Sequence, residues 1–444
     1  MKKYDSYKDS GVEWIGDLPS NWQIKRIKHT TYVKGRIGWQ GMRSDEFLES
    51  SDSYVVTGTD FMKGLVKWDT CYQVPLERYE EDPFIQLREG DLLITKDGTI
   101  GKIAVVKDIP KIATLNSGVF LTRPLFDSYV PEFMYWILYS EVFKTFYDYN
   151  KSGSTIQHLY QNVFNEFMFP LPTIKEQTTI VNYLDYKTTQ IDNLIAKKEQ
   201  FIKLLEEERF AVINQAVTKG LNLTLPMKDS GIEWLGKIPE HWEVKRLRNI
   251  VDTVKTGSTP PSDEIQYFEP QEINWYGPGD FDKLKLGDAK RKISQLAIEQ
   301  NKCRLFPSNS ILLIGIGATV GKVGLATEPC SSNQQINAII LKEFYNARFY
   351  LYFLSTIKEI IVMEASSATL PIFNQTQTKN ISVSVPPIEE QNKIVDFIEN
   401  QMERVQTIIE KSKHEIELLK EYKTALISEV VTGKIDVRNE KLNK

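Results

Sequence analysis

Cysteine is scarce in this chain of 444 residues. Its three cysteines, Cys71, Cys303 and Cys330, lie at least 27 positions apart, so they form no close-spaced zinc motif, and their odd number argues against a disulfide framework. Long apolar runs are missing too. No stretch of 18 uncharged apolar residues occurs, and the first residues carry two lysines without the apolar core of a signal peptide. We expect a cytoplasmic protein that does not contact a membrane.

An excess of positive charge is absent as well. Lysine and arginine number 55 against 59 aspartates and glutamates, which gives a net charge of −4. A protein that coats nucleic acid through bulk charge should be strongly basic. Binding of nucleic acid would therefore depend on local patches of the surface or on partner proteins.

The sequence also lacks the motifs of common catalytic sites. Residues 315–322 (GIGATVGK) resemble a phosphate-binding loop, but that loop needs glycine where Ile316 stands and Ser or Thr where Val323 stands. A tight turn between two strands explains these glycines better. The chain has no Asp/Asn-Pro-Pro-aromatic loop of an amino-methyltransferase, and its four histidines lack metal-ligand spacing. We expect a chain that holds no metal and catalyses nothing alone.

What the sequence does contain is a long internal repeat. The segment KDSGVEWIGDLPSNWQIKR at 8–26 matches KDSGIEWLGKIPEHWEVKR at 228–246, at an offset of 220, with 11 of 19 positions identical. Agreement of this extent does not arise by chance. The chain is therefore two copies of one unit of about 220 residues.

Two further pairs of segments support the duplication. DLLITKDGTIGKIAVV (91–106) corresponds to SILLIGIGATVGKVGLA (310–326) at the same offset. Later, at an offset of 214, PLPTIKEQTTIVNYLDY (170–186) corresponds to VPPIEEQNKIVDFIENQ (385–401). The offset changes by only six residues along the repeat, so the two copies share one plan.

Each copy ends in a segment with the pattern of a long helix. Across 180–213 and 394–430, apolar residues recur at spacings of three, four and seven, with lysines and glutamates between them. Thr173 and Glu176 have the spacing of a capping box, and Pro387 presets the first turn of the second helix. A helix of about 45 residues with one apolar stripe needs a long partner. The equivalent helix is that partner, and we expect an antiparallel pair.

The rest of each copy has the pattern of short strands. Residues 91–106 predict a strand, an Asp-Gly turn and a second strand, and short helices are predicted at 130–149 and 344–364. The predicted fold class is α+β: two globular domains with antiparallel-sheet cores, separated by two long antiparallel helices in a coiled-coil-like pair, with a pseudo-two-fold internal repeat. The predicted boundaries are 1–170 and 221–384 for the globular domains, 171–220 and 385–436 for the helices, and 437–444 for a tail.

Several loops in the globular blocks carry residue types that suit contacts with DNA. Hydroxyls, amides and cations beside small residues can hydrogen-bond to phosphates and base edges. Ordinary surface turns have the same composition, and the two explanations carry similar weight. The candidates are Lys34, Arg36, Gln40, Thr57, Thr59, Lys96, Ser154, Thr155 and Gln157 in the first copy, and Lys255, Thr256, Ser258, Thr259, Tyr276, Ser367 and Thr369 in the second.

Together the repeated motifs resemble the specificity subunit of type I restriction-modification systems. The resemblance covers essentially the whole chain. It implies two target-recognition domains, each reading one part of a bipartite, interrupted site in double-stranded DNA, held apart by the paired helices. It rests on Trp14 and Trp22 in the opening motif, Gly101-Lys102 in the strand pair, Pro172 with Glu176-Gln177 before the helix, and their counterparts in the second copy.

The same resemblance implies partners that carry the chemistry. Two modification subunits would bind S-adenosylmethionine and methylate adenine, and restriction subunits would add translocation and cleavage that depend on ATP and Mg. No cofactor is expected on this chain. The mildly acidic charge agrees with this arrangement, because the partners can close around the duplex and supply positive surface.

Three alternatives stay open at this point. The chain would serve equally as the specificity subunit of a related multi-subunit or fused restriction enzyme, which neighbouring genes would reveal. A scaffold that binds proteins rather than DNA would leave the methylation of the genome unchanged when the gene is removed. A nuclease would have to cleave DNA alone with a metal ion.

Overall fold

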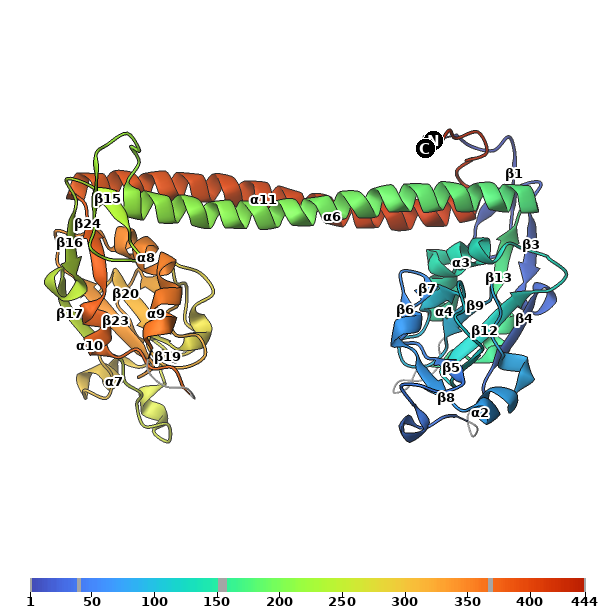
Figure 1. Ribbon diagram of the computed structural model, residues 1–444, viewed down its shortest axis with the longest axis horizontal. Coiled ribbons are helices and arrows are strands. Elements are labelled where there is room, and N and C mark those ends of the chain that lie inside the picture. The colour runs from blue at the N-terminus through green and yellow to red at the C-terminus, as the bar shows by residue number, and fades with distance from the viewer. Residues whose placement is uncertain (1, 38–40, 151–157, 366–369, 443–444) are drawn as a thin grey trace. The chain divides into compact units, whose positions relative to one another are not determined.

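The computed structural model describes residues 2–37, 41–150, 158–365 and 370–442 (Figure 1). The chain forms two compact units. Unit 1 consists of Met1–Lys198 together with Lys413–Lys444, and unit 2 of Glu199–Ser412. Both ends of the chain therefore belong to unit 1. Within the described ranges, no helix is long and apolar enough to cross a membrane.

Unit 1 is an α+β structure. Its strands are β1 (Tyr7–Asp9), β2 (Asp17–Pro19), β3 (Gln23–Arg26), β4 (Thr31–Gly35), β5 (Ser53–Val56), β6 (Phe61–Met62), β7 (Leu65–Val66), β8 (Tyr72–Val74), β9 (Leu92–Thr95), β10 (Ile103–Val105), β11 (Ala113–Leu115), β12 (Val119–Pro124) and β13 (Met168–Leu171). Its helices are α1 (Ile27–Thr30), α2 (Leu76–Glu80), α3 (Pro131–Tyr139), α4 (Glu141–Asn150), α5 (Gln161–Asn165) and the first part of α6 (Ile174–Lys219).

The main sheet of unit 1 has six strands in the order β4-β12-β9-β10-β7-β6. Its pairs are antiparallel apart from β10 and β7, which are parallel. A second sheet, β11-β5-β8, contains one further parallel pair, β11 and β5. Strand β13, which leads into α6, pairs antiparallel with β3 of the opening motif. The two ends of the first copy therefore meet in one strand pair.

Unit 2 repeats this plan with fewer strands. Its strands are β14 (Met227–Asp229), β15 (Lys237–Pro239), β16 (Glu243–Arg246), β17 (Val251–Thr256), β18 (Ile273–Tyr276), β19 (Lys292–Ile293), β20 (Ser310–Ile314), β21 (Val323–Ala326), β22 (Ser331–Ser332), β23 (Ile336–Leu341) and β24 (Ser382–Val385). Its helices are α7 (Gln295–Glu299), α8 (Ala347–Thr356), α9 (Lys358–Glu364), α10 (Gln375–Asn380) and the first part of α11 (Ile388–Val431). The antiparallel sheet β17-β23-β20-β21 corresponds to β4-β12-β9-β10 of the six-stranded sheet, and β24 pairs with β16 as β13 pairs with β3.

The predicted fold class is confirmed. Residues 91–106 form β9, a turn and β10, and 310–326 form β20, a turn and β21. Each predicted short helical segment forms two consecutive helices, α3 and α4 in the first copy and α8 and α9 in the second. The sheets are mixed rather than purely antiparallel, because β11 pairs with β5, and β22 with β18, in parallel. Such pairs arise between strands far apart in the chain, which periodicity alone does not detect.

The two long helices run antiparallel, as their apolar stripes predict (Figure 1). In unit 1, Leu184 near the start of α6 shares a core with Leu426 near the end of α11. In unit 2, Val217 near the end of α6 shares a core with Ile394 near the start of α11. Each helix thus contributes one part of its length to each unit.

The tryptophans of the opening motif explain the glycines that follow the helices. Trp22 and Trp242 are fully buried. Gly433 follows α11 and Gly220 follows α6, both with φ of +74°, a backbone conformation that favours glycine. A Cβ atom would lie 3.1 Å from the Trp22 ring at Gly433 and 3.2 Å from the Trp242 ring at Gly220. The opening motif of each copy therefore packs on the end of the helix contributed by the other copy.

Two buried glutamines anchor the long helices to the globular blocks. The Gln177 side chain accepts a hydrogen bond from the Val130 N–H (2.8 Å) and donates one to the proline carbonyl five positions earlier (2.9 Å). Gln391 repeats both contacts, with the Asn346 N–H (3.0 Å) and its own preceding proline (2.9 Å). Their side chains are 0% and 1% exposed. Each glutamine therefore ties the start of a long helix to the start of α3 or α8.

The glutamates beside these glutamines differ between the two units. The Thr173 hydroxyl accepts from the Glu176 N–H (3.4 Å), which is half of the predicted capping box. The Glu176 carboxylate accepts from the Tyr4 hydroxyl (2.7 Å) near the beginning of the chain. In unit 2 the carboxylate of Glu390 accepts from the Trp242 indole N–H (3.0 Å). One sequence motif thus makes different contacts in the two units.

Replacing Gln391 by leucine should destabilise unit 2. The substitution keeps the volume but leaves the Asn346 N–H and a proline carbonyl without their partner, at a cost of about 2–4 kcal/mol. We expect faster hydrogen exchange of the amides in β20 and β23, measured by mass spectrometry. Gln406→Leu is the control, because Gln406 is exposed on α11. Equal exchange in the two variants would show that Gln391 is no anchor.

Candidate nucleic-acid interface

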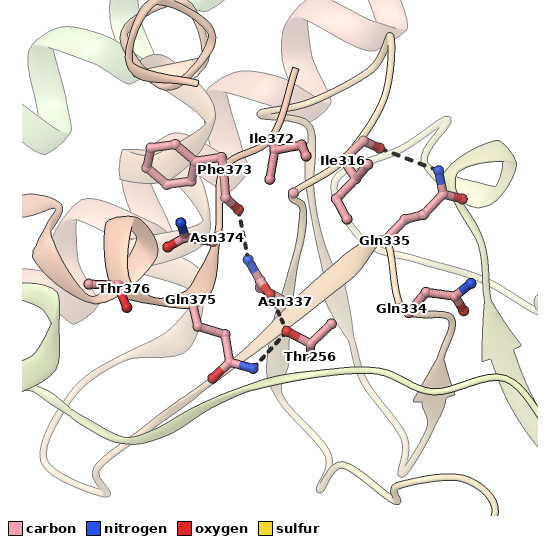
Figure 2. A pocket seen from close by; sticks show the side chains of 11 residues that line it. Thr256, Ile316, Gln334, Gln335, Asn337, Ile372, Phe373, Asn374, Gln375 and Thr376 are labelled. Atoms are coloured by element: carbon pink, nitrogen blue, oxygen red, sulfur yellow. Dashed lines mark hydrogen bonds between the residues drawn. The ribbon is translucent and has the colours of Figure 1, made fainter. Parts of the chain in front are cut away.

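A polar cleft of about 280 Å³ lies in unit 2, beside the ends of β17 and β20 (Figure 2). Its side chains are hydroxyls, carboxamides and apolar groups, and its lining residues carry no charge. Four segments that are separate in the sequence meet here. They contribute Thr256, Gly315, Ile316, Gln334, Gln335, Asn337, Ile372, Phe373, Asn374, Gln375 and Thr376.

A chain of hydrogen bonds forms the base of this cleft. The Thr256 hydroxyl donates to the Asn337 side-chain oxygen (2.8 Å), and the Gln375 carboxamide lies 2.7 Å from the same hydroxyl (Figure 2). The Asn337 amide nitrogen donates to the Phe373 carbonyl and the Thr378 hydroxyl, both at 3.1 Å. Asn337 is only 3% exposed, so its contacts hold the walls of the cleft together.

Unit 1 has a cleft of about 250 Å³ at the corresponding place. The register of the sheets establishes the correspondence, because Gly35 in β4 lies opposite Phe120 in β12 as Thr256 lies opposite Asn337. The same strand ends therefore frame both clefts. The residues that line the unit 1 cleft are Gly35, Arg36, Ile37, Lys96, Asp97, Phe120, His158, Leu159, Tyr160 and Gln161.

A glutamine at the start of a short helix is shared by the two clefts. Gln161 begins α5, and its amide nitrogen donates to the Val33 carbonyl in β4 (2.9 Å). Gln375 begins α10, and with its nitrogen facing the Val254 carbonyl in β17 (3.2 Å) it makes the equivalent contact. The two glutamines lie at the offset of 214. The framework of the cleft is thus duplicated together with the chain.

The side chains that line the two clefts differ in chemistry. In unit 1, Asp97 lies 2.8 Å from Lys96 and 2.5 Å from His158. Burial raises the pKa of Asp97, but the hydrogen bonds from Lys96 and His158 outweigh burial and lower that pKa below its ordinary value. In unit 2, Gly315 stands at the position of Lys96, Ile316 at that of Asp97 and Ile372 at that of His158. The first cleft is ionic and the second is neutral.

Four of the predicted residues of unit 2 lie at the end of β17 or in the loop that follows it, next to the cleft. Thr256 lines it, and the Thr259 hydroxyl donates to Gln334 at its edge. Lys255 is exposed next to Thr256, and the backbone of Ser258 is hydrogen-bonded to β22 (2.8 Å). The loop after β17 therefore lies beside the cleft, and its contact with DNA stays a prediction.

The predicted residues of unit 1 are more dispersed. Lys96 lines the cleft. The Lys34 ammonium lies over the Phe84 ring, 5.5 Å from its centroid. Thr57 and Thr59 are outside the lining, and their hydroxyls lie 2.7 Å from each other. The structure thus brings only Lys96 of these four to the cleft.

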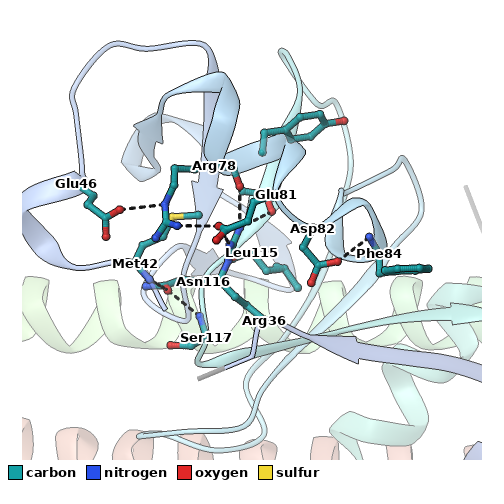
Figure 3. A network of polar contacts seen from close by, with 12 residues as sticks. Arg36, Met42, Glu46, Arg78, Glu81, Asp82, Phe84, Leu115, Asn116 and Ser117 are labelled. Atoms are coloured by element: carbon teal, nitrogen blue, oxygen red, sulfur yellow. Dashed lines mark hydrogen bonds and ion pairs between the residues drawn. The ribbon is translucent and has the colours of Figure 1, made fainter. Parts of the chain in front are cut away.

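Arg36 is placed differently from the prediction (Figure 3). It is 2% exposed. Its guanidinium donates to the Leu115 carbonyl (2.8 Å), the Glu81 carboxylate (2.9 Å), the Arg78 carbonyl (3.1 Å) and the Thr114 hydroxyl (3.2 Å). A phosphate or base would have to break these bonds. Arg36 is therefore a structural residue, and a DNA contact for it is not supported.

Tyr276 is a second correction. Its ring is 3% exposed within a hydrophobic core, and its hydroxyl donates to the Gly287 carbonyl (2.7 Å). Burial raises its pKa to about 12. The glycines that follow it made the segment look like an exposed loop, but the tyrosine itself belongs to β18.

The remaining candidates cannot be placed. Gln40, Ser154, Thr155, Gln157, Ser367 and Thr369 lie outside the described residues. Their contact with DNA stays a prediction.

Several residues of the clefts were missed in the sequence. Gln334, Asn374 and Gln375 in unit 2 and His158 in unit 1 belong to segments that are polar without any motif. The repeat could have identified one pair of these residues, because Gln161 and Gln375 align at the offset of 214 that also relates 170–186 to 385–401. Among the residues that the structure describes, no group of three or more His, Cys, Asp or Glu side chains has a geometry suited to a metal ion.

The fold is similar to that of solved type I restriction-modification structures. A chain from a study of complex assembly and conformational transition of the type I R-M system has a TM-score of 0.70 and 18% identity, with 94% of this chain and 99% of that chain covered. The HsdS subunit from Thermoanaerobacter tengcongensis has a TM-score of 0.58 and 17% identity, with 94% and 98% covered. At these identities the likeness establishes the fold.

Curated relatives are similar along the sequence. The type I restriction enzyme MjaIX specificity subunit of Methanocaldococcus jannaschii is 25% identical over 437 residues, which are 95% of each protein. The type I restriction enzyme EcoBI specificity subunit of Escherichia coli is 27% identical over 373 residues, covering 80% of this chain and 75% of that protein.

The family model of the type I restriction modification DNA specificity domain matches residues 19–204 and 239–418. These two matches fall on the two copies of the repeat and together span most of the chain. The duplicated strand pairs, glutamine anchors and clefts are thus features of a chain that belongs to the type I restriction-modification DNA specificity family.

Proposed function

We propose that the chain selects a bipartite, interrupted DNA site, with each unit reading one part of it. The observation that carries this proposal is the pair of clefts, which have one framework and two linings. Equal frameworks suit equal modes of docking on a duplex, and different linings suit different base sequences. Membership in the DNA specificity family supports DNA recognition, and the duplication supports one reading unit in each copy.

The chemistry on the DNA is assigned to partners. Modification subunits with S-adenosylmethionine would methylate adenine in the selected site, and restriction subunits would add cleavage with ATP and Mg. The curated relatives support this arrangement, because they are named as specificity subunits of type I restriction enzymes. The cytoplasm is the proposed compartment, since the DNA of the cell is there and the three cysteines are free.

The charge of the chain limits how tightly it binds DNA alone. Residues 173–220 hold seven basic and seven acidic side chains, and residues 387–438 hold eight and eleven. With a total of −4, the remaining chain carries about −1, so the globular blocks have no excess of positive charge. Most of the affinity for a polyanion would then come from the partner surfaces.

Loss of the gene should remove adenine methylation at one interrupted motif. This follows because no other component of the complex would select that sequence. Methylome sequencing of cells with and without the gene measures it directly. An unchanged methylome in cells that express the partner subunits would overturn the proposal and favour a protein scaffold.

Exchange of residues 30–165 for the matching segment of a relative should change one half of the methylated motif. The segment contains the whole lining of the unit 1 cleft and leaves unit 2 intact. Methylome sequencing of the hybrid reports both halves at once. A change in both halves would refute independent readers.

The purified chain should bind its site weakly, and the complex with modification subunits should bind it tightly. Fluorescence anisotropy with a labelled duplex, repeated at several salt concentrations, compares the two. Binding by the lone chain should fall steeply as salt rises. Nanomolar affinity of the lone chain at physiological salt would contradict the charge argument.

A further inference from the structure

The unit 2 cleft combines two kinds of groups in one small space. The carboxamides of Gln334 and Asn374 line it, and so do the apolar side chains of Ile316 and Ile372 (Figure 2). Ile372 is 36% exposed. The cleft therefore offers hydrogen-bond donors and acceptors beside an accessible apolar surface.

We propose that Gln334 and Asn374 are the specificity-determining residues of unit 2, and that they select an A·T base pair in the major groove. This inference rests on the proposed function and names the residues and the base pair for one of the two readers.

The chemistry of the A·T pair matches the cleft. In the major groove adenine presents an acceptor at N7 and a donor at N6, and thymine presents a methyl group. A carboxamide donates through its nitrogen and accepts through its oxygen, so it pairs with both adenine atoms. Ile316 and Ile372 suit contact with a methyl group. A G·C pair offers no methyl group and replaces the adenine donor by an acceptor.

The two carboxamides have nitrogens available for a ligand. The Gln334 oxygen accepts from the Thr259 hydroxyl. The Asn374 oxygen accepts from the Gln377 N–H (3.0 Å) and thereby caps α10. Within the described part of the chain, neither side-chain nitrogen has a hydrogen-bond acceptor among its contacts. Their oxygens are thus fixed by the protein while their donors are free.

The segment that carries Asn374 is held in place before DNA arrives. The Phe373 N–H donates a hydrogen bond to the Gly315 carbonyl in the loop after β20 (2.7 Å). Gln377 closes the capping box by accepting from the Asn374 N–H (2.9 Å). A prepositioned side chain loses little entropy on binding and discriminates well between similar bases.

The unit 1 cleft is the internal contrast. Its Lys96, Asp97 and His158 form an ionic cluster where unit 2 is neutral. A reader that used only the shared framework would treat both halves of the site alike. The difference in lining assigns selection to the side chains of each cleft rather than to their common frame.

The test uses the full chain in complex with its modification partner and duplexes containing 7-deazaadenine. This analogue lacks the N7 acceptor and still pairs with thymine. Each adenine of the unit 2 half-site, other than the methylated one, is replaced in turn. We expect wild-type binding to fall roughly tenfold at one adenine.

Two variants connect that loss to the proposed side chains. Asn374→Asp keeps the oxygen that caps α10 and removes the donor, and Gln334→Met removes the carboxamide at similar size. Both should bind native DNA more weakly, and the variant that has lost the carboxamide in contact with N7 should lose less than about twofold at the sensitive adenine, because that contact is already gone. Asn392→Asp is the control, since Asn392 is exposed on α11 and outside the cleft. It should behave as wild type.

The outcomes separate this inference from the proposed function. If the wild-type complex does not distinguish its site from a scrambled duplex, the proposed function fails. If it does distinguish them but tolerates 7-deazaadenine at every tested position, the assignment of the cleft fails. Full sensitivity in both Asn374→Asp and Gln334→Met, or the same response in Asn392→Asp, also overturns the assignment.

Discussion

The need to cover the apolar stripe of each long helix determines the rest of the structure. Helices α6 and α11 have 46 and 44 residues, and a helix of this kind is stable in water mainly through packing of its apolar face. Neither globular block covers a whole stripe. Each unit therefore contains parts of both helices, and residues such as Ile180 and Leu426 belong to the same core as Trp22 and Phe133. Helices and blocks form one packed structure within each unit.

Glutamine anchors extend this dependence to the candidate interface. Gln177 and Gln391 fix the beginning of each long helix to α3 or α8, and the same blocks carry the clefts. Gln161 and Gln375 repeat between the two copies and hold the frame of the clefts that they line. Positions that differ line the clefts, such as Asp97. A duplicated protein can in this way keep one stable frame and vary what the frame presents.

Sequence reasoning performed well where a period or a repeat reported on structure. The long helices, the strand pairs and the duplication followed from spacing alone. Individual site residues were harder, because exposure depends on contacts distant in the chain. Arg36 resembled a phosphate ligand, yet its side chain is buried and pairs with Glu81, 45 positions away. Gln334 belongs to no motif in the sequence, and it becomes a candidate only because the fold places it in the same cleft as Asn374.

Unit 1 is assembled from both ends of the chain, and this has a consequence for biosynthesis. Its core includes Leu426 and Val430, which leave the ribosome after every residue of unit 2. The nascent chain can thus complete its second reader before its first. A premature stop at codon 413 would preserve all of unit 2 and deprive unit 1 of part of its core. Both readers are complete only when translation has reached the end of α11. A truncated product would therefore retain the second reader and lack a complete first one, although the first is encoded earlier.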